Sequence, residues 1–246
     1  MPARGEPHLS VVIPAHDEAD RLATTLRRIS GYLDERRIDS EVLVVDDGSR
    51  DATPEVARRL LDGRRGRVLR RTERGGKGAA VRLGVAEAAG RWVLVTDADL
   101  STPIEEYGRL ADVARDRDRD VVIGSRAVAG SRVEVRQHVV RETLGKAFNV
   151  LMRAMTGLPF RDTQCGFKLF DRKRTKPLFE RMVVDGFAWD VELLFLCVRF
   201  GLRVEEIPVV WRNDPKTTVS LLADPPRMLL DLLRVRWRFR TGAYNP

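Results

Sequence analysis

Residues 93–103 read VLVTDADLSTP, a stretch that begins as a buried β-strand and then changes character. Four of its first five residues are apolar or β-branched, which is typical of a strand, and Asp97 and Asp99 follow with only Ala98 between them. Charged side chains are rarely buried unless they are paired or bind a metal. Two explanations are open: the carboxylates cap the turn after the strand, or a cation offsets their mutual repulsion.

Strands and helices alternate around this stretch. We expect strands at residues 9–15, 41–47, 67–72, 91–99, 120–126 and 203–211. We expect helices at residues 22–33, 52–61, 76–90, 103–115, 138–156, 175–182, 189–200 and 228–239. Such alternation predicts an α/β fold, with a Rossmann-like, mostly parallel sheet, helices on both faces and a helical segment at the C-terminus.

The composition is that of a basic globular protein. Lysine and arginine number 44 against 36 acidic residues, and residues 225–246 hold five arginines and one aspartate. A basic C-terminal segment favours an anionic partner, either membrane phospholipid or nucleic acid. The cysteines, Cys165 and Cys197, lack metal-ligand spacing and fit reduced thiols of a cytosolic protein. Without a signal peptide or a spanning apolar run, we expect any membrane contact to be peripheral.

Polar clusters follow four of the expected strands, at residues 16–18, 46–49, 97–101 and 124–126. In an open α/β sheet, ligands bind beyond the carboxyl ends of the strands. One cluster alone fits a turn cap, but four at one edge favour a ligand site. Two carboxylates spaced i, i+2 suit Mg²⁺ or Mn²⁺, which bridge carboxylates to substrate phosphates. The pattern therefore predicts a phosphorylated substrate.

The segment GGKGAAV, residues 75–81, helps to narrow the class of substrate. The chain has no P-loop motif, and Val81 stands where a dinucleotide fingerprint requires its third glycine, so a Rossmann dehydrogenase is disfavoured. A glycine-rich helix start with Lys77 suits a diphosphate, through backbone N–H groups and one cation. The alternative is a flexible turn with a solvated lysine.

The ordered motifs carry a resemblance to a known family. Five of them are VVIPAHDE (11–18), VVDDGSRDAT (44–53), GGKGAAVRLG (75–84), TDADLS (96–101) and GSR (124–126). They resemble the nucleotide-sugar domain of the family 2 glycosyltransferases, which have the GT-A fold. Three more are RDTQCGFKLF (161–170), FAWDVELLF (187–195) and VVWRNDPKTTVSL (209–221). These are similar to dolichyl-phosphate glucosyltransferases and bacterial polyprenyl-phosphate sugar synthases, over residues 9–240.

The resemblance implies a role for each matching residue. The nucleoside pocket would be lined by Pro14, Ala15, His16 and Glu18, with Asp46 or Asp47 at the edge of the base, and Lys77 would approach the diphosphate. The metal motif would be Asp97-Ala98-Asp99, with Asp99 as the direct ligand, and Arg126 and Arg141 would meet the phosphates or the acceptor. The sugar and acceptor would be surrounded by Asp162, Gln164, Trp189, Asp190 and Glu192. A loop with Arg212 and Lys216 would close over the nucleotide, although Asp-Pro-Lys replaces the usual Gly-Ser-Lys, and His16 replaces a common tyrosine.

The resemblance also implies domain limits and a place in the cell. Residues 1–8 are expected to be disordered, and residues 9–222 to form one GT-A domain. Its nucleotide-sugar half would end near residue 126, and its acceptor half would span residues 127–222. Residues 223–246 would form a basic amphipathic helix and tail. We expect a cytoplasmic protein at the cytoplasmic face of a membrane, while the sequence does not indicate its oligomeric state.

The reaction implied is inverting transfer of a hexose, glucose first, from a UDP-sugar to dolichyl or polyprenyl phosphate, with Mg²⁺ or Mn²⁺. A phosphate monoester has its second pKa near ~6, so it needs positioning by cations rather than deprotonation. Arginine suits that task, and we therefore assign Arg126 and Arg141 to the acceptor. If the acceptor were a hydroxyl, Asp190 or Asp162 would be the candidate base.

Other functions compete with this interpretation. A transferase that acts on a hydroxyl of a cell-envelope glycan or a soluble acceptor would share most of the motifs. A basic nucleic-acid-binding protein fits the pI of about 10.0, but aromatic residues are only 7% and no recognisable binding module is present. A sugar-phosphate nucleotidyltransferase is disfavoured because its glycine-rich signature is absent from the first strand. The C-terminal helix fits membrane contact and packing on the domain equally well.

Overall fold

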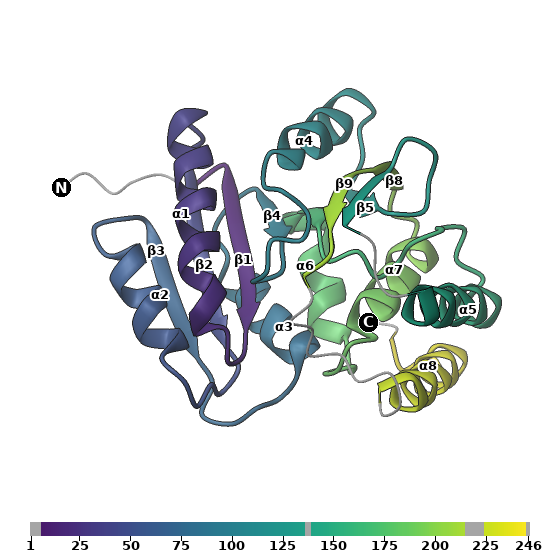
Figure 1. Ribbon diagram of the computed structural model, residues 1–246. Helices are drawn as coiled ribbons and strands as arrows, with labels where there is room; N and C mark the ends of the chain where they lie inside the picture. The colour runs from purple at the N-terminus through teal and green to yellow at the C-terminus, as the bar shows by residue number, and fades with distance from the viewer. Residues whose placement is uncertain (1–5, 136–138, 215–223, 245–246) are drawn as a thin grey trace.

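The computed structural model describes residues 6–135, 139–214 and 224–244, and its main feature is one seven-stranded sheet (Figure 1). The strand order is β3-β2-β1-β4-β7-β5-β8. Its strands are β1 Leu9–Ala15, β2 Ser40–Asp46, β3 Gly66–Arg70, β4 Trp92–Val95, β5 Val121–Ser125, β7 Lys168–Asp171 and β8 Val204–Pro208. Strand β7 is antiparallel to both of its neighbours, while the other pairings are parallel. The expected mostly parallel α/β sheet is confirmed.

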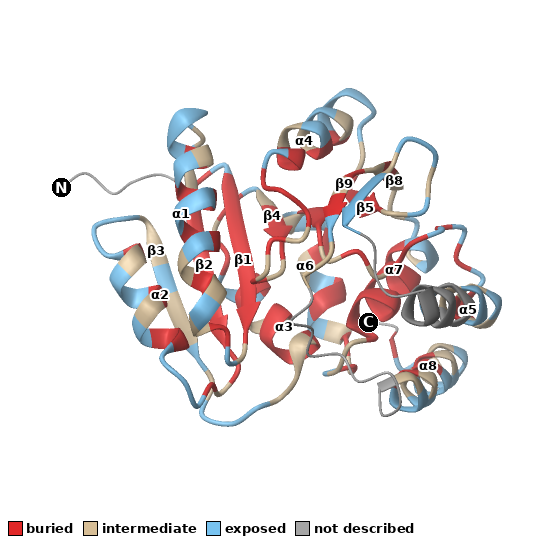
Figure 2. Cartoon of the chain, in the orientation of Figure 1, coloured by how far each residue is buried: buried red, intermediate tan, exposed pale blue. Residues whose placement is uncertain are grey.

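Helices cover both faces of this sheet, because the strand residues alternate between two apolar layers. Val11 and Ile13 of β1 belong to one buried cluster, with side chains of α1, α2 and α4, while Val12 belongs to the other, with side chains of α3, α6 and α7. The helices are α1 Ala19–Glu35, α2 Thr53–Leu61, α3 Lys77–Glu87, α4 Glu106–Asp116, α5 Val139–Thr156, α6 Arg172–Arg181, α7 Trp189–Arg199 and α8 Asp224–Arg240. Figure 2 shows central strands such as β1 and β2 buried between these layers, while the edge strand β3 is less buried.

Three strand features differ from the expectation. The expected strand at residues 203–211 is two strands, β8 and β9 (Val210–Arg212), because the chain leaves β5 and pairs instead with β6 (Arg132–Val135). Strands β6 and β7 were not expected, since each has only four residues and lacks a period long enough to identify. Strand β7 has a functional consequence, because its antiparallel direction places its first residue, Lys168, at the edge where the parallel strands end.

The expected domain limits stay a prediction. Strands β1 to β5 and the later strands β7 and β8 join a single sheet, so both expected halves share that sheet. Residues 1–5 lie outside the described residues, and residues 6–8 are described. The amide of His8 donates to the carbonyl of Asp39 at 2.9 Å, and the carbonyl of Pro7 accepts from the amide of Arg91 at 3.1 Å.

Helix α8 lies beside α5 and packs on the domain (Figure 1). Its inward face buries Met228, Leu232 and Val235. A simple amphipathic helix would place only polar side chains, here arginines, on its outward face. In α8, large apolar side chains are exposed there between the arginines. These side chains are Leu230, Leu233 and Trp237, and Val150 and Leu151 of α5 are exposed as well. Among the described residues, no helix combines the length and apolar character needed to span a membrane.

Candidate active site at the carboxyl edge of the sheet

The expected polar clusters meet at one edge of the sheet. Strands β1, β2, β4 and β5 run in the same direction, and each is followed there by a polar residue. The ring of His16 connects the first two strand ends, because its Nδ1 lies 3.0 Å from the carbonyl oxygen of Asp47. Strand β4 ends at Val95, so Asp97 and Asp99 lie in the turn that follows it.

Asp97 is paired with Lys77 across this edge. Nζ of Lys77, the first residue of α3, lies 2.5 Å from Oδ1 of Asp97. The other carboxylate oxygen packs on the backbone of Gly166, where a Cβ would lie only 1.9 Å from it. Any larger residue at position 166 would therefore displace the carboxylate. Burial lowers the pKa of Lys77, but Asp97, with Asp190 and Asp99 nearby, raises it overall, so its ammonium stays charged.

Asp99 is held differently from Asp97. Its Oδ1 accepts a hydrogen bond from the amide of Ser101 at 2.9 Å, and the described residues give it no salt bridge. Burial and the neighbouring charge of Asp97 both raise the pKa of Asp99. The two carboxylates are therefore not equivalent, because Lys77 neutralises the first, while the second lacks a cation of its own.

The glycine loop before α3 is held by hydrogen bonds within the chain. The Asp47 carboxylate accepts from the amides of Gly75 and Gly76 at 2.9 and 2.7 Å. The carbonyl of Asp185 accepts from the amide of Gly78 at 2.7 Å. These amides are thus already engaged, in contrast to the expected cradle of free N–H groups. The part of this segment that reaches Asp97 is the charged side chain of Lys77.

The expected nucleoside pocket has His16 as its accessible member. Pro14 and Ala15 are buried in β1, and Asp46 is fully buried beneath the edge. Oδ1 of Asp46 accepts from the amide of Ser49 at 3.1 Å, and its Oδ2 lies 3.3 Å from Nε of Arg70. Asp46 therefore shapes the turn after β2, and its second oxygen is buried beside Arg70.

Glu18 does not lie free in this pocket. It forms a two-pronged pair with Arg21, one turn further along α1. Arg21 also donates to Asp214 at 3.0 Å, so it connects α1 to the segment after β9. We did not expect Arg21 from the sequence. Arg71 was missed as well, and its Nε lies 3.0 Å from Oδ1 of Asp47.

Arg126, directly after β5, is clamped by Asp162. Its Nε and Nη2 donate to the two carboxylate oxygens at 2.7 and 2.9 Å, and its amide adds a third bond at 2.9 Å. The guanidinium also lies over the ring of Trp211, 5.3 Å from its centroid. Although burial opposes ionisation, Arg126 lowers the pKa of Asp162 to about 2. Asp162 is therefore an orienting partner of Arg126 and a poor proton acceptor.

A buried pair, Lys168 and Asp190, lies beneath the site. Nζ of Lys168 donates to the carbonyl of Cys165 and lies 3.3 Å from Oδ2 of Asp190. Both side chains are buried, and the ammonium lies 5.5 Å from the ring centroid of Trp189. The sequence did carry a signal for Lys168, because a lysine inside the apolar run CGFKLF is unusual. We had not singled it out.

Three expected residues do not face the site directly. Trp189 is buried and stacks on Phe179, so it belongs to the core rather than to a sugar pocket. The Glu192 carboxylate is fully buried and accepts from the backbone at Val184 at 2.8 Å. Gln164 is part-buried beside α8, with its Nε2 4.0 Å from Sδ of Met228.

Two expected cations cannot be placed. Lys216 and the side chain of Arg141 lie outside the described residues, although α5 includes position 141. Arg212 is described, and it pairs with Glu134 while its amide donates to the carbonyl of Ser101 at 2.8 Å. Strand β9 is thereby attached to the turn that holds Asp97 and Asp99.

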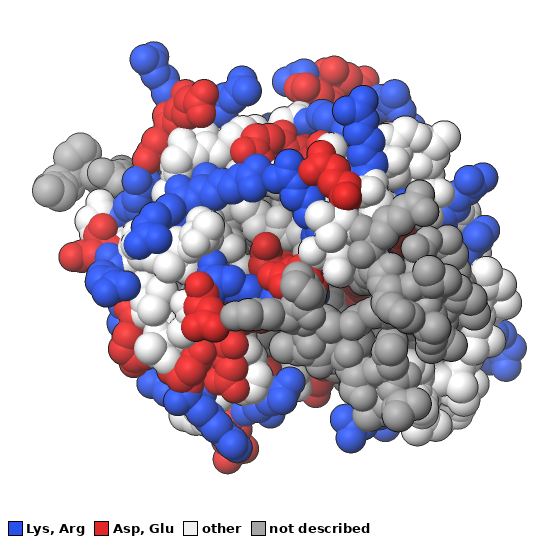
Figure 3. All heavy atoms as spheres, viewed as in Figure 1, with Lys and Arg blue, Asp and Glu red and all other residues white. Residues whose placement is uncertain are grey.

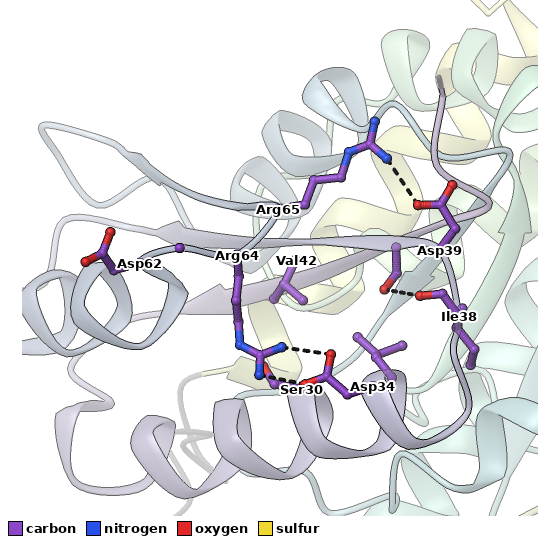
Figure 4. Close-up of a pocket in the computed structure, with 11 residues that line it drawn as sticks. Ser30, Asp34, Ile38, Asp39, Val42, Asp62, Arg64 and Arg65 are labelled. Atoms are coloured by element: carbon purple, nitrogen blue, oxygen red, sulfur yellow. Dashed lines mark hydrogen bonds and ion pairs between the residues drawn. The ribbon is translucent and has the colours of Figure 1, made fainter. Parts of the chain in front are cut away.

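Two cavities differ in their relation to this edge. One of about 340 Å³ borders Asp99, between α1 and the end of β9. A larger one, about 460 Å³, lies at the opposite edge, where β2 begins (Figure 4). Its arginines are paired within it, Arg64 with Asp34 and Arg65 with Asp39. The larger cavity is therefore remote from the clustered motif residues.

The residues present fit a hard divalent ion only in part. Within the described ranges, no group of three or more His, Cys, Asp or Glu side chains gathers as a complete metal site. Asp97 and Asp99 supply carboxylate oxygens, which Mg²⁺ and Mn²⁺ prefer, and such ions commonly complete their shell with substrate phosphates and water. Of the two carboxylates, that of Asp99 has no cation beside it within the described residues.

The comparisons with known proteins identify the family of this chain. The family described as Glycosyl transferase family 2 matches residues 10–179, which include all of β1 but its first residue, β2 to β5, β7 and the carboxylate pair. The chain belongs to glycosyl transferase family 2. This family 2 chain is 34% identical over 250 residues to a dolichyl-phosphate beta-glucosyltransferase of Drosophila melanogaster, covering 96% of the chain and 77% of that relative.

Solved structures share the fold of this family 2 chain, which is the GT-A glycosyltransferase fold. Mannosyl-3-phosphoglycerate synthase from Rubrobacter xylanophilus has a TM-score of 0.69 at 21% identity, covering 98% of the chain and 76% of the other. Glucosyl-3-phosphoglycerate synthase from Mycobacterium tuberculosis, solved with Mn²⁺, UDP-glucose and phosphoglyceric acid, has a TM-score of 0.66 at 22% identity, covering 93% and 79%.

Proposed function

We propose that this glycosyltransferase moves glucose from UDP-glucose to the phosphate of dolichol or another polyprenol, with inversion at the anomeric carbon. The observation that carries the proposal is the pairing of the carboxylates at the edge of the sheet. Asp97 is paired with Lys77, Asp162 with Arg126 and Asp190 with Lys168. A phosphate acceptor needs cations and no general base, and this arrangement suits it.

The donor would lie along the ends of β1, β2 and β4. His16 would stack on the base, and Lys77 would contact the diphosphate. Asp99 would bind the divalent ion, with Asp97 beside it. When bound, the ion supplies positive charge to the diphosphate as it leaves. Lys77 would add a second, fixed positive charge at the same place.

The acceptor phosphate would meet Arg126. The fork of Asp162 fixes one side of the guanidinium and the ring of Trp211 supports its face, so its remaining donors stay oriented. Arg141 is proposed as the second acceptor cation, on the strength of the family resemblance alone. Attack on the anomeric carbon by a phosphate oxygen then requires no proton transfer from the acceptor.

The test is a transfer assay with Mn²⁺ and a panel of labelled nucleotide sugars. Label from UDP-glucose should enter the organic phase with polyprenyl phosphate and should not do so with polyprenol, which lacks the phosphate. Mass analysis of the lipid should show one hexose phosphodiester. Transfer to polyprenol, or to a soluble hydroxyl but not to the lipid phosphate, would favour the hydroxyl-acceptor alternative.

We propose that the outward faces of α5 and α8 contact an anionic membrane at its cytoplasmic side, where the lipid acceptor is presented. Exposed Leu230, Leu233 and Trp237 suit the acyl boundary, and the arginines between them suit lipid phosphates. Nucleic acid is a poorer fit, because basic and acidic side chains intermingle over the described part of the face in Figure 3.

A further inference from the structure

The last described residue of the chain reaches the interior of the domain. Helix α8 ends near Gly242, whose φ of +74° turns the chain back. This turn buries Tyr244, which is only 1% exposed. Its hydroxyl donates to Oε1 of Glu192 in α7 at 2.5 Å. Arg238 lies over the same ring, with its Cζ 5.4 Å from the centroid.

Glu192, which accepts the hydrogen bond from Tyr244, also binds a short segment before α7. The carboxylate is fully buried, and it accepts from the amide of Val183 at 3.0 Å and from that of Val184 at 2.8 Å. A buried carboxylate that accepts three hydrogen bonds holds all three donors in place. Loss of any one bond costs free energy, because the buried charge then has fewer hydrogen-bond donors around it. The segment 183–186 therefore depends on Glu192 for its position.

The same segment holds the start of α3. The carbonyl of Asp185 accepts from the amides of Gly78 and Ala79 at 2.7 and 3.3 Å. A Cβ on Gly76 would lie 2.4 Å from that carbonyl oxygen, and a Cβ on Gly78 would lie 2.4 Å from the carbonyl oxygen of Val184. Lys77 lies between these two glycines, so its backbone is set directly by the segment.

We infer that Tyr244 and Glu192 are positioning residues, which couple the end of helix α8 to Lys77 through the backbone of residues 183–186. Neither side chain needs to touch a substrate for this role. The consequence for binding rests on the proposed function, in which Lys77 contacts the nucleotide diphosphate. The coupling itself is a property of the fold and can be measured without any substrate.

The experiment compares Tyr244→Phe with Tyr107→Phe in the full chain. Tyr107 is also buried, at 4% exposed, but it lies in α4 on the other face of the sheet. Both variants lose one hydroxyl and keep their ring, so thermal melting should show both folded. By hydrogen exchange, Tyr244→Phe should speed exchange about tenfold at residues 183–184 and at Gly78 and Ala79, because the anchored segment opens more often. Tyr107→Phe should leave both segments as in the wild type.

A second readout is UDP binding by calorimetry with Mn²⁺. Tyr244→Phe should weaken UDP about fivefold, while Tyr107→Phe should not, because only the former releases Lys77. Glu192→Gln should weaken it further, since one carbonyl oxygen replaces two carboxylate oxygens. Unchanged exchange at residues 78–79 in both Tyr244→Phe and Glu192→Gln would overturn the coupling. If the wild type bound no UDP, the proposed function would fail, and the exchange data would still decide the coupling.

Discussion

Nζ of Lys77 lies 2.5 Å from Oδ1 of Asp97, whereas Asp99, two residues further, forms no salt bridge within the described residues. The two carboxylates that follow β4 therefore have different tasks. Lys77 offsets the charge of Asp97 within the fold, so the turn is stable before any ligand binds. Asp99 keeps an uncompensated charge at the surface of the site, and a divalent ion is the partner that it suits.

We expect Asp99→Asn to lose transfer almost completely. The amide keeps the shape and the hydrogen bond from Ser101, but it lacks the charge that binds the ion. Activity should fall at least about 100-fold, and thermal stability should stay close to that of the wild type or rise, because a half-buried, unpaired charge is removed. The control is Asp62→Asn, in the remote cavity. Near-normal turnover of Asp99→Asn with Mn²⁺ would refute the assignment.

Lys77→Met is expected to act on donor binding. The variant removes the cation from both Asp97 and the diphosphate, and UDP should bind about 10- to 100-fold more weakly, as for loss of a charge-assisted contact of ~1.5–3 kcal/mol. Calorimetry of UDP with Mn²⁺ measures this. Lys173→Met, at an exposed position of α6, should bind UDP normally, and equal binding by the two variants would contradict the role of Lys77.

Much of the fold could be predicted from the sequence, because long strands such as β1 and β2 carry continuous apolar runs. The carboxylate pair could be located too, since a parallel sheet brings its strand ends to one edge. Strand β7 could not be predicted, because a strand of four residues is too short to show a hydrophobic period. Its antiparallel insertion between β4 and β5 depends on distant segments and leaves no mark in the local sequence. The lysine within the apolar run CGFKLF was visible in the sequence, but its place at the edge of the site follows only from the antiparallel direction of β7.

The site itself could be predicted as a set of residues but not as a set of contacts. Asp162 and Asp190 were candidate bases by their chemistry, and only the structure shows that Arg126 and Lys168 neutralise them. Likewise, the amides of Gly75 and Gly76 look free in the sequence, although Asp47 binds both. Such partners are distant along the chain, and local patterns do not identify them.

Acid should destabilise the wild type partly through Asp162. Its pKa is lowered to about 2 by Arg126, below the usual ~3.9, so the unfolded chain binds the proton more readily. This contribution is present above about pH 4 and is lost as the pH falls toward 2. Asp162→Asn lacks it, so its unfolding free energy at pH 7 should be about 2 kcal/mol lower and should fall less between pH 4 and 2. Denaturant titrations at each pH test this, with Asp116→Asn as the exposed control.

Lys168→Met should destabilise the fold more than a typical core substitution. It leaves the buried Asp190 without its cation, and breaking a buried pair costs about 3–5 kcal/mol. The double variant with Asp190→Asn removes both charges and should recover much of this loss. Urea denaturation of the single and double variants measures the coupling. Strictly additive losses would show that the pair does not act as a unit.

Substitution of the outward face of α8 should release the protein from membranes. Each buried CH₂ contributes about 0.8 kcal/mol at a bilayer, so Leu230→Ser, Leu233→Ser and Trp237→Ser together should reduce flotation with anionic vesicles at least about tenfold. Substitution is a better test than deletion of the helix, because deletion would also remove Tyr244, which is bonded to Glu192 in the core. Val198→Ser, at another exposed apolar position, is the matched control. Equal flotation of the triple variant and the control would show that α8 is packed on the domain without a membrane role. Loss of flotation with normal UDP binding would show that membrane attachment and donor binding are separate properties.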